Sequence, residues 1–250
     1  MSGRNLKLTL AYDGTPFVGW QRQAAGESIQ GLLEDALARL EGAPVTAHGA
    51  GRTDAGVHAL AQVASVRVTF SHDPPTVMRA LNATLPAAIR VTGVDDAPAS
   101  FHARFDARSK CYRYQIANEP VPSPFTRAFA WHVPEALDRA AMDAAAAALL
   151  GTHDFAAFQS SGSDVQTTVR TLTRSAWLDD AGLLVYEVEG DGFLRHMVRA
   201  IVGTLVEIGR GWRPAAQIAS LVAGGARADA GSTAPPHGLL LARVEYRDRA

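Results

Sequence analysis

The sequence predicts an α+β fold made of two consecutive β-α-β-β-α-β halves. Strand-like segments with alternating apolar residues are separated by stretches in which apolar residues recur with the 3.6-residue period of a helix. This order of elements occurs twice along the 250 residues. We therefore expect two ferredoxin-like halves, residues 1–104 and 105–250, whose antiparallel sheets join into one continuous sheet. Helices would cover one face of this sheet and leave the other face open for a cleft.

In the first half, the alternation of Leu6, Leu8 and Leu10 with polar residues predicts a strand. Ser28 is a typical N-cap residue, and it precedes an apolar stripe at helical spacing that ends at Gly42. The other elements expected here are strands at 45–50 and 60–70, a short helix after Pro75 and a strand at 89–94.

In the second half, the same patterns predict two main helices among four strands. The helices are expected at 136–150, which is rich in alanine, and at 194–208. An additional helix is expected at 215–222, and the polar run 159–164 predicts a mobile loop. The strands are expected at 111–117, 170–178, 183–189 and 239–246.

The composition indicates a soluble globular protein of the cytoplasm. Hydrophobic residues make up 47% and charged residues 20% of the chain, which is enough for a substantial core. A single cysteine, Cys111, cannot form an internal disulfide, and no spacing of histidine and cysteine predicts a zinc site. We expect neither a signal peptide nor a membrane segment, because no apolar run has the required length.

The net charge gives no support for a nucleic-acid partner. Twenty-four Lys and Arg residues against 25 Asp and Glu residues give a formal net charge of −1, so any RNA-binding surface has to be a local patch. Nearly all the basic residues are arginine, whose planar guanidinium suits phosphates and bases. A genome rich in arginine and alanine codons explains this count equally well.

The most unusual segment is the glycine-rich run from Gly49 to His58, which contains Arg52 and Asp54. Its glycines would let the backbone approach a ligand closely, while the flanking strands hold the loop. Arg52 is near enough in sequence to favour an ionised Asp54, and a nucleophilic carboxylate has to be ionised. Dinucleotide-binding and phosphate-binding loop patterns do not fit this run. The alternative is an ordinary hairpin in which Asp54 only caps a turn.

Two further segments carry side chains that suit an RNA site. The helix expected at 194–208 is apolar around most of its surface, so Arg199 would need an anionic partner. On the first strand of the second half, Tyr112 and Tyr114 share a face with Lys110, an arrangement that stacks unpaired bases in many sheets. The alternatives are an arginine that reaches solvent and tyrosines that only pack in the core.

Ordered motifs across nearly the whole chain resemble those of the TruA family of tRNA pseudouridine synthases. The most specific is the run Gly51-Arg52-Thr53-Asp54-Ala55-Gly56-Val57-His58. The accompanying motifs are Tyr12-Asp13-Gly14, Phe17-x-Gly19-Trp20-Gln21-x-Gln23, Phe101-His102-Ala103-Arg104-Phe105, Tyr112-Arg113-Tyr114, His153-Asp154-Phe155, His196-Met197-Val198-Arg199, Val202-Gly203 and Ala234-Pro235-Pro236-x-Gly238-Leu239.

This resemblance implies an isomerase in which Asp54 is the nucleophile that breaks the bond between uracil N1 and the ribose. The base would then turn and rejoin the sugar through C5; whether Asp54 attacks C1′, assists glycal formation or adds to C6 stays open. Tyr112 would stack on the target base, Arg199 would pair with Asp54, and Leu239 would wall the pocket. Arg52 would help to extrude the nucleotide.

By the same resemblance, the substrate would be the tRNA anticodon stem-loop at positions 38, 39 and 40. The two halves would resemble RNA-binding RRM domains, with an active-site cleft on the face that the helices leave open. A homodimer would offer the second RNA surface. No cofactor, metal or protein cofactor is implied, because the reaction only isomerises its substrate. The near-neutral chain would need its RNA-contacting arginines in one patch, which we expect to contain Arg22, Arg52, Arg104, Arg108 and Arg113.

Two other functions fit parts of the sequence. Asp13-Gly14-Thr15 resembles part of an aspartate-based phosphotransferase motif, but Ala11 stands where that motif has its nucleophilic aspartate. A non-catalytic RNA-binding module could use the same open sheet. In that case the change Asp54→Asn would leave function intact, whereas in a synthase it would abolish turnover.

Overall fold

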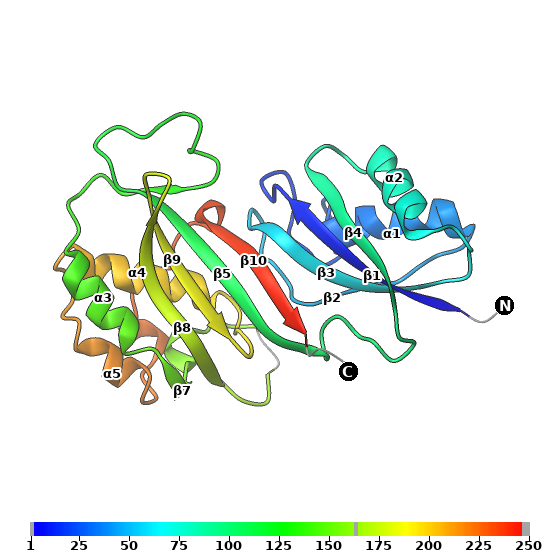
Figure 1. Ribbon diagram of the computed structural model, residues 1–250. Coiled ribbons are helices and arrows are strands. Elements are labelled where there is room, and N and C mark those ends of the chain that lie inside the picture. The colour runs from blue at the N-terminus through cyan, green and yellow to red at the C-terminus, as the bar shows by residue number, and fades with distance from the viewer. Residues whose placement is uncertain (1–2, 163–164, 247–250) are drawn as a thin grey trace. The chain divides into compact units, whose positions relative to one another are not determined.

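The computed structural model describes residues 3–162 and 165–246, and the chain divides into two compact units (Figure 1). Among these residues, unit 1 comprises 3–108 and 241–246, and unit 2 comprises 109–240. The sequence placed the boundary at 104/105 and assigned the whole C-terminal part to the second half. The last strand, β10 (Leu239–Tyr246), instead starts in unit 2 and lies mainly in unit 1.

Each unit has the mixed α+β character that the sequence predicts, with mainly antiparallel strands. In unit 1, β1 (Arg4–Tyr12) pairs with β3 (His58–Val68) on one side and with β4 (Ile89–Ala97) on the other. The short strand β2 (Ala47–Gly49) also pairs with β3, and β10 lies next to β3. These pairings fix both ends of the segment that joins β2 to β3.

Two helices, α1 (Ile29–Glu41) and α2 (Pro74–Thr84), accompany the strands of unit 1 (Figure 1). The hydroxyl of Ser28 accepts a hydrogen bond from the N–H of Gly31 at 3.2 Å, and Gly42 ends α1 with a left-handed φ of 75°. These contacts confirm the predicted start and end of this helix. The fully buried apolar side chains of β1 and α1 are Leu6, Leu8, Leu10, Ile29, Leu33 and Leu37.

In unit 2, four strands follow one another with antiparallel pairing, and a two-residue strand pairs parallel to the first of them. In sheet order, the strands are β5 (Ala107–Ala117), β9 (Leu183–Gly190), β8 (Val169–Asp180) and β7 (Gly151–Asp154), with β6 (Trp131–His132) beside β5. The helices are α3 (Arg139–Ala147), α4 (Met197–Gly209) and α5 (Gln217–Leu221), and the 3-10 turns are η1 (Ala156–Phe158), η2 (Arg227–Asp229) and η3 (Pro236–Gly238).

The structure differs from the sequence prediction mainly at the ends of helices in unit 2. The helix α3 starts later than residue 136, because the carboxylate of Asp138 caps it by accepting from the N–H of Ala141 at 3.0 Å. The helix α4 starts later than residue 194, because His196 has a left-handed φ of 61°. The predicted mobile loop at 159–164 includes residues 163 and 164, which lie outside the described residues.

None of the helices in the described part of the chain combines the length and the apolarity that spanning a bilayer requires. The side chain of Cys111 is buried on β5. The sequence predicted the type of every main helix and strand that the structure describes. It missed the two short strands β6 and β7.

Candidate active site

Asp54 lies in the loop that joins β2 to β3 in unit 1, and its side chain is partly exposed. Two hydrogen bonds from other segments and one within the loop hold it in place. The N–H of Trp20 donates to the carbonyl of Thr53 at 3.0 Å, and the side-chain amide of Gln62 donates to the carbonyl of Gly51 at 2.8 Å. Within the loop, the N–H of Val57 donates to the carbonyl of Asp54 at 3.1 Å. The backbone at Asp54 is thus fixed by neighbouring elements as well as by its own turn.

Two glycines from the N-terminal motifs allow this close packing. A Cβ atom at Gly14 would lie 2.0 Å from the carbonyl oxygen of Val57, and one at Gly19 would lie 2.6 Å from the carbonyl oxygen of Thr53. Gly19 also has a φ of 106°, which side-chain-bearing residues rarely adopt. Both motifs therefore serve the loop that carries Asp54, although they precede it by more than thirty residues.

A buried hydroxyl pair supports the loop from β1. The hydroxyls of Tyr12 and Thr53 lie 2.9 Å apart, and the side-chain amide of Gln62 reaches the Tyr12 hydroxyl at 3.4 Å. Burial raises the pKa of Tyr12 to about 12, so the phenol is neutral at physiological pH. Tyr12 acts here as a hydrogen-bonding support beneath the residue that precedes Asp54.

Asp13, which suggested a phosphotransferase motif, caps a turn. Its carboxylate accepts from the N–H and hydroxyl of Thr15 at 2.9 and 2.6 Å, and it lies 3.2 Å from Nδ1 of His58. Partial burial opposes ionisation, but the hydrogen bonds from Thr15 and the nearby His58 outweigh it and hold the pKa of Asp13 below its usual value. These contacts are typical of an Asx turn.

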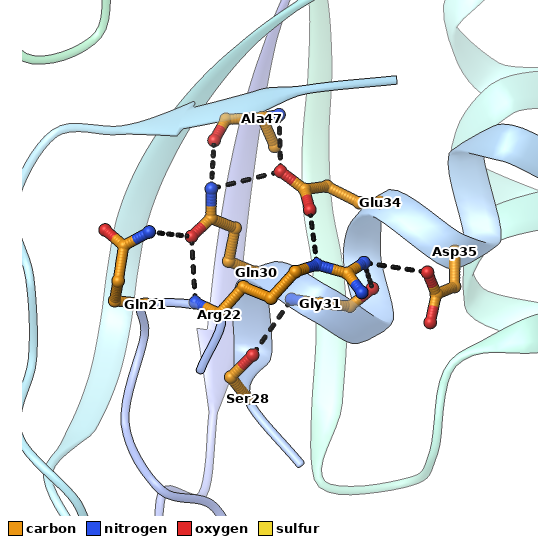
Figure 2. Close-up of polar contacts among 8 residues, drawn as sticks. All are labelled: Gln21, Arg22, Ser28, Gln30, Gly31, Glu34, Asp35 and Ala47. Atoms are coloured by element: carbon orange, nitrogen blue, oxygen red, sulfur yellow. Dashed lines mark hydrogen bonds and ion pairs between the residues drawn. The ribbon is translucent and has the colours of Figure 1, made fainter. Parts of the chain in front are cut away.

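Arg22 takes part in a polar network in unit 1 (Figure 2), and Arg52 is joined to this network through Gln21. The exposed Arg52 donates from Nε to the side-chain oxygen of Gln21 at 3.1 Å, and the amide of Gln21 donates to Gln30 at 2.8 Å. Gln30 in turn accepts from the N–H of Arg22 at 3.0 Å and donates to the carbonyl of Ala47 on β2 at 3.0 Å. The network ties α1 and β2 to the segment that contains Gln21 and Arg22, which in turn contacts Arg52.

The guanidinium of Arg22 is itself engaged by two carboxylates of α1 (Figure 2). It lies 2.7 Å from Asp35 and 2.8 Å from Glu34. The hydrogen bonds to these two carboxylates raise the pKa of Arg22, and the bond to Asp35 has the larger effect. Because these carboxylates offset its charge, Arg22 attracts phosphate less strongly than an arginine that lacks acidic neighbours. Its contact with RNA stays a prediction.

The other predicted arginines differ in their surroundings. Arg104 and Arg108 are exposed in unit 1, and the guanidinium of Arg104 lies over the ring of Phe105, 5.7 Å from its centroid. Arg113 lies in unit 2, where it pairs with Glu187 at 2.7 Å and with Asp180 at 3.1 Å. As with Arg22, these acidic partners weaken the case for Arg113 as a phosphate ligand.

Unit 2 holds the predicted tyrosine and arginine. Tyr112 on β5 is only 7% exposed, and its ring meets the edge of Phe193 at a centroid distance of 4.9 Å. Tyr114 is fully buried, and its hydroxyl donates to the carbonyl of Pro235 at 2.8 Å. Burial raises the pKa of Tyr114 strongly, although the positive charge of Arg199 opposes this effect. Core packing therefore describes Tyr114 better than an open stacking face does.

The segment from Ala234 to Leu239 connects Arg199 with the tyrosine strand. Nε of Arg199 donates to the carbonyl of Ala234 at 2.8 Å, and the N–H of Ala234 donates back to the carbonyl of Arg199 at 3.0 Å. A Cβ at Gly238 would lie 2.7 Å from the ring of Tyr114, so only glycine fits there. Leu239, 5% exposed, follows directly at the start of β10. This motif thus positions Arg199 and Leu239 within one unit.

Two polar residues on α4 support this arrangement, and sequence reasoning missed both. Glu207 accepts from the N–H and the hydroxyl of Ser232 at 2.8 and 2.9 Å and pairs with Arg213. The hydroxyl of Thr204 accepts from the N–H of Gly231 at 2.9 Å. The signal was present, because these are polar positions on an otherwise apolar helix.

Asp54 and Arg52 belong to unit 1, whereas Tyr112, Arg199 and Leu239 belong to unit 2. Their meeting in one pocket therefore stays a prediction. Among residues 3–162 and 165–246, no group of three or more His, Cys, Asp and Glu side chains is placed to hold a metal ion.

Comparisons with known proteins agree on one family. A family model described as tRNA pseudouridine synthase matches residues 9–106 and 145–247. tRNA pseudouridine synthase A of Syntrophotalea carbinolica is 48% identical over 242 residues, which cover 96% of both chains. The enzyme of the same name from Solidesulfovibrio magneticus is 48% identical over 248 residues, covering 96% of this chain and 90% of that protein. That of Solibacter usitatus is 45% identical, with coverage of 97% and 100%.

A chain in the crystal structure of a Cbf5–Nop10–Gar1 complex also matches, at 12% identity and a TM-score of 0.37, over 94% of this chain and 48% of that one. This likeness is too weak to assign a fold.

Proposed function

Because the chain belongs to the family of tRNA pseudouridine synthases, which are isomerases, we propose that it converts uridine into pseudouridine at positions 38, 39 and 40 of the tRNA anticodon stem-loop. The relatives are matched along nearly their whole length, which supports the same activity for this chain. The alternative, an RNA-binding module without catalysis, becomes an outcome of the experiment below.

Asp54 is the proposed nucleophile, and one observation supports this role above the others. Its loop is anchored to β1, to β3 and to the segment at Trp20, while the Asp54 side chain itself is partly exposed. A carboxylate on so rigid a support can be held against a reacting atom without a further loss of conformational freedom. Asp54 is required for breaking the bond between uracil N1 and the ribose; the base then rejoins the sugar through C5, which loses its proton, while N1 gains one.

Tyr112, Arg199 and Leu239 are the proposed partners of Asp54. The bond from Arg199 Nε to the carbonyl of Ala234 orients the guanidinium, which then pairs with the Asp54 carboxylate. Tyr112 stacks on the target base, and Leu239 walls the pocket. Taking a base out of its stack costs a few kcal/mol, which stacking and phosphate contacts have to offset.

The proposed RNA contacts are Arg52, Arg104, Arg108 and Arg22, with Arg52 assisting extrusion of the nucleotide.

We also propose that the units are ferredoxin-like halves whose sheets join into one, with the helices on one face and the active-site cleft on the other. Two copies of the chain bind the RNA as a homodimer. Light scattering after size-exclusion chromatography tests the dimer, since a monomeric mass at working concentration would contradict it.

The decisive experiment measures the release of tritium from tRNA that carries 5-tritiated uridine, because substitution at C5 releases this label. Asp54→Asn should lower the rate by more than about a thousandfold, since it removes the nucleophile. Its tRNA affinity in filter binding should stay close to that of the wild type.

Asp143→Asn provides the matched control, because it makes the same chemical change on the surface of α3. This variant should turn over like the wild type. Tritium release by Asp54→Asn at the wild-type rate would contradict the catalytic role and would favour the non-catalytic RNA-binding module.

A further inference from the structure

Unit 1 contains a cavity that the catalytic proposal does not use. It has a volume of about 450 Å³ and lies beside β1, β2 and β3, with walls that include Asn5, His48, Arg67, Phe101 and His102. No acidic side chain of the described residues lines it. A cavity of this size accommodates a ligand as large as a nucleotide.

A row of three aromatic rings lies at this cavity, and the rings at both ends of the row, His48 and Phe105, are exposed. The ring centroids of His48 and His102 are 5.0 Å apart, and those of His102 and Phe105 are 4.3 Å apart. Phe105 ends the row with 75% of its surface exposed, and the guanidinium of Arg104 lies 5.7 Å from its ring centroid. The row thus presents one exposed aromatic face beside one cation.

The turn that carries the exposed ring is fixed by hydrogen bonds. Nδ1 of His102 accepts from the N–H of Arg104 at 3.1 Å, and the carboxylate of Asp106 accepts from the N–H of His102 at 2.8 Å. The N–H of Ala103 donates to the hydroxyl of Ser65 on β3 at 3.1 Å. Burial and the nearby His48 lower the pKa of His102, which favours a neutral ring in the row. Phe105 is therefore held outward by a rigid support.

This arrangement differs from a hydrophobic residue that is exposed by chance. Single exposed apolar side chains are common and need no function. Trp212 in unit 2 serves for comparison: it is 66% exposed, and the guanidinium of Arg210 lies 4.7 Å from its ring centroid. Phe105 adds a row of two neighbouring histidine rings and a cavity whose lining has no acidic side chain among the described residues, a combination that suits an aromatic, anionic ligand.

We propose that Phe105, with Arg104, His102 and the adjoining cavity, binds an unpaired nucleotide of the tRNA other than the target uridine. The base stacks on Phe105, and Arg104 contacts the phosphate or the face of the base. This proposal rests on the proposed function, because it takes the RNA substrate as the ligand. Since the bound nucleotide is not the one that reacts, the contact contributes to binding of the RNA in the ground state and the transition state alike.

The test is the tRNA dependence of tritium release by variants of Phe105. Phe105→Ala should raise KM for tRNA about fivefold or more and change kcat by less than about twofold, as expected when one stacked base is lost. Phe105→Trp should restore the wild-type KM, whereas Phe105→Leu should not, because stacking needs a planar ring. Trp212→Ala is the control that removes an exposed aromatic next to an arginine, and its KM should equal that of the wild type.

An unchanged KM in Phe105→Ala, or restoration by leucine, would overturn the proposal. The same comparison is made by filter binding in the Asp54→Asn background, where no turnover is needed. If the wild type releases no tritium, the proposed function fails, but the binding measurement still decides whether Phe105 contacts RNA.

Discussion

Gly14 shows how one residue can serve a loop, that of Asp54, which lies far away in the sequence. Its N–H donates to Nδ1 of His58 at 3.0 Å, and its Cα faces the backbone of Val57 so closely that a side chain has no room. Val57 and His58 directly follow the turn of Asp54. The size of residue 14 therefore determines where this turn can lie.

Gly14→Ala should destabilise the chain and lower its activity. The added Cβ would lie 2.0 Å from the carbonyl oxygen of Val57, so one backbone segment has to move. Such overpacking costs about 1–3 kcal/mol or more of the free energy of unfolding. Urea unfolding and tritium release measure the two effects.

The control for this substitution is Gly93→Ala on β4. Its nearest neighbour would be Cβ of Thr9 at 3.5 Å, which is an ordinary contact. Gly93→Ala should therefore unfold at nearly the wild-type urea concentration. Equal stability losses in the two variants would refute a special role for Gly14.

At the scale of elements, α4 and the segment 230–235 form one supporting structure for Arg199. A Cβ at Gly203 would lie 1.7 Å from the carbonyl oxygen of Ser232, so the segment passes directly against the helix. Glu207 and Thr204 then hold it by hydrogen bonds to Ser232 and Gly231. This packing explains why the Val202-Gly203 motif and the Ala234-Pro235-Pro236 motif occur together.

Glu207→Gln should weaken this structure in a pH-dependent way. Burial alone would raise the pKa of Glu207, but hydrogen bonds from Ser232 and Arg213 outweigh it and hold the pKa below the usual 4.5. A carboxylate whose pKa is lower in the folded chain stabilises it above the unfolded pKa, and this contribution is lost as the pH falls towards the folded value. At neutral pH, the variant should lose about 1–3 kcal/mol of unfolding free energy.

Urea unfolding as a function of pH measures this effect. Between about pH 5 and pH 3, the stability of the wild type should fall more steeply than that of Glu207→Gln, so that the difference between them shrinks. Glu27→Gln changes an exposed glutamate outside this network and should keep the pH dependence of the wild type. A difference that stays constant with pH would show that the charge of Glu207 has no part in the effect.

The elements that could be predicted from the sequence are those whose signals are local. For α1, the Ser28 cap, the apolar stripe and Gly42 are all read within 15 residues, and the helix lies where they indicate. The strand β6 was missed because its two residues are too short for any alternation to appear. The ion pairs of Arg22 were missed because Glu34 and Asp35 also satisfy the pattern of an exposed helix face.

At the scale of the whole molecule, the sequence predicted the repeated order of elements, but not which unit the last strand joins. Periodicity identified the strand at 239–246, and the structure has β10 at these residues. The strand partners of β10 are distant in sequence, and alternation carries no information on pairing across such distances. Asp54 and Arg199 are also distant in sequence, so local patterns could not predict that they meet. Their proposed roles rest on the motifs that contain them, and their common pocket stays a prediction.

The net charge of −1 leads to the last prediction, which concerns how the whole chain binds RNA. Because the chain as a whole does not attract a polyanion, tRNA binding has to depend on a few arginines whose phosphate contacts release counterions. Arg108→Glu in the proposed patch should weaken tRNA binding and reduce the slope of log affinity against log salt by about one. Arg79→Glu makes the same change in net charge on α2 and should leave that slope unchanged. Filter binding over a series of KCl concentrations distinguishes the two cases. Equal slopes in both variants would mean that the whole charge of the molecule, rather than a patch at Arg108, governs its affinity for RNA.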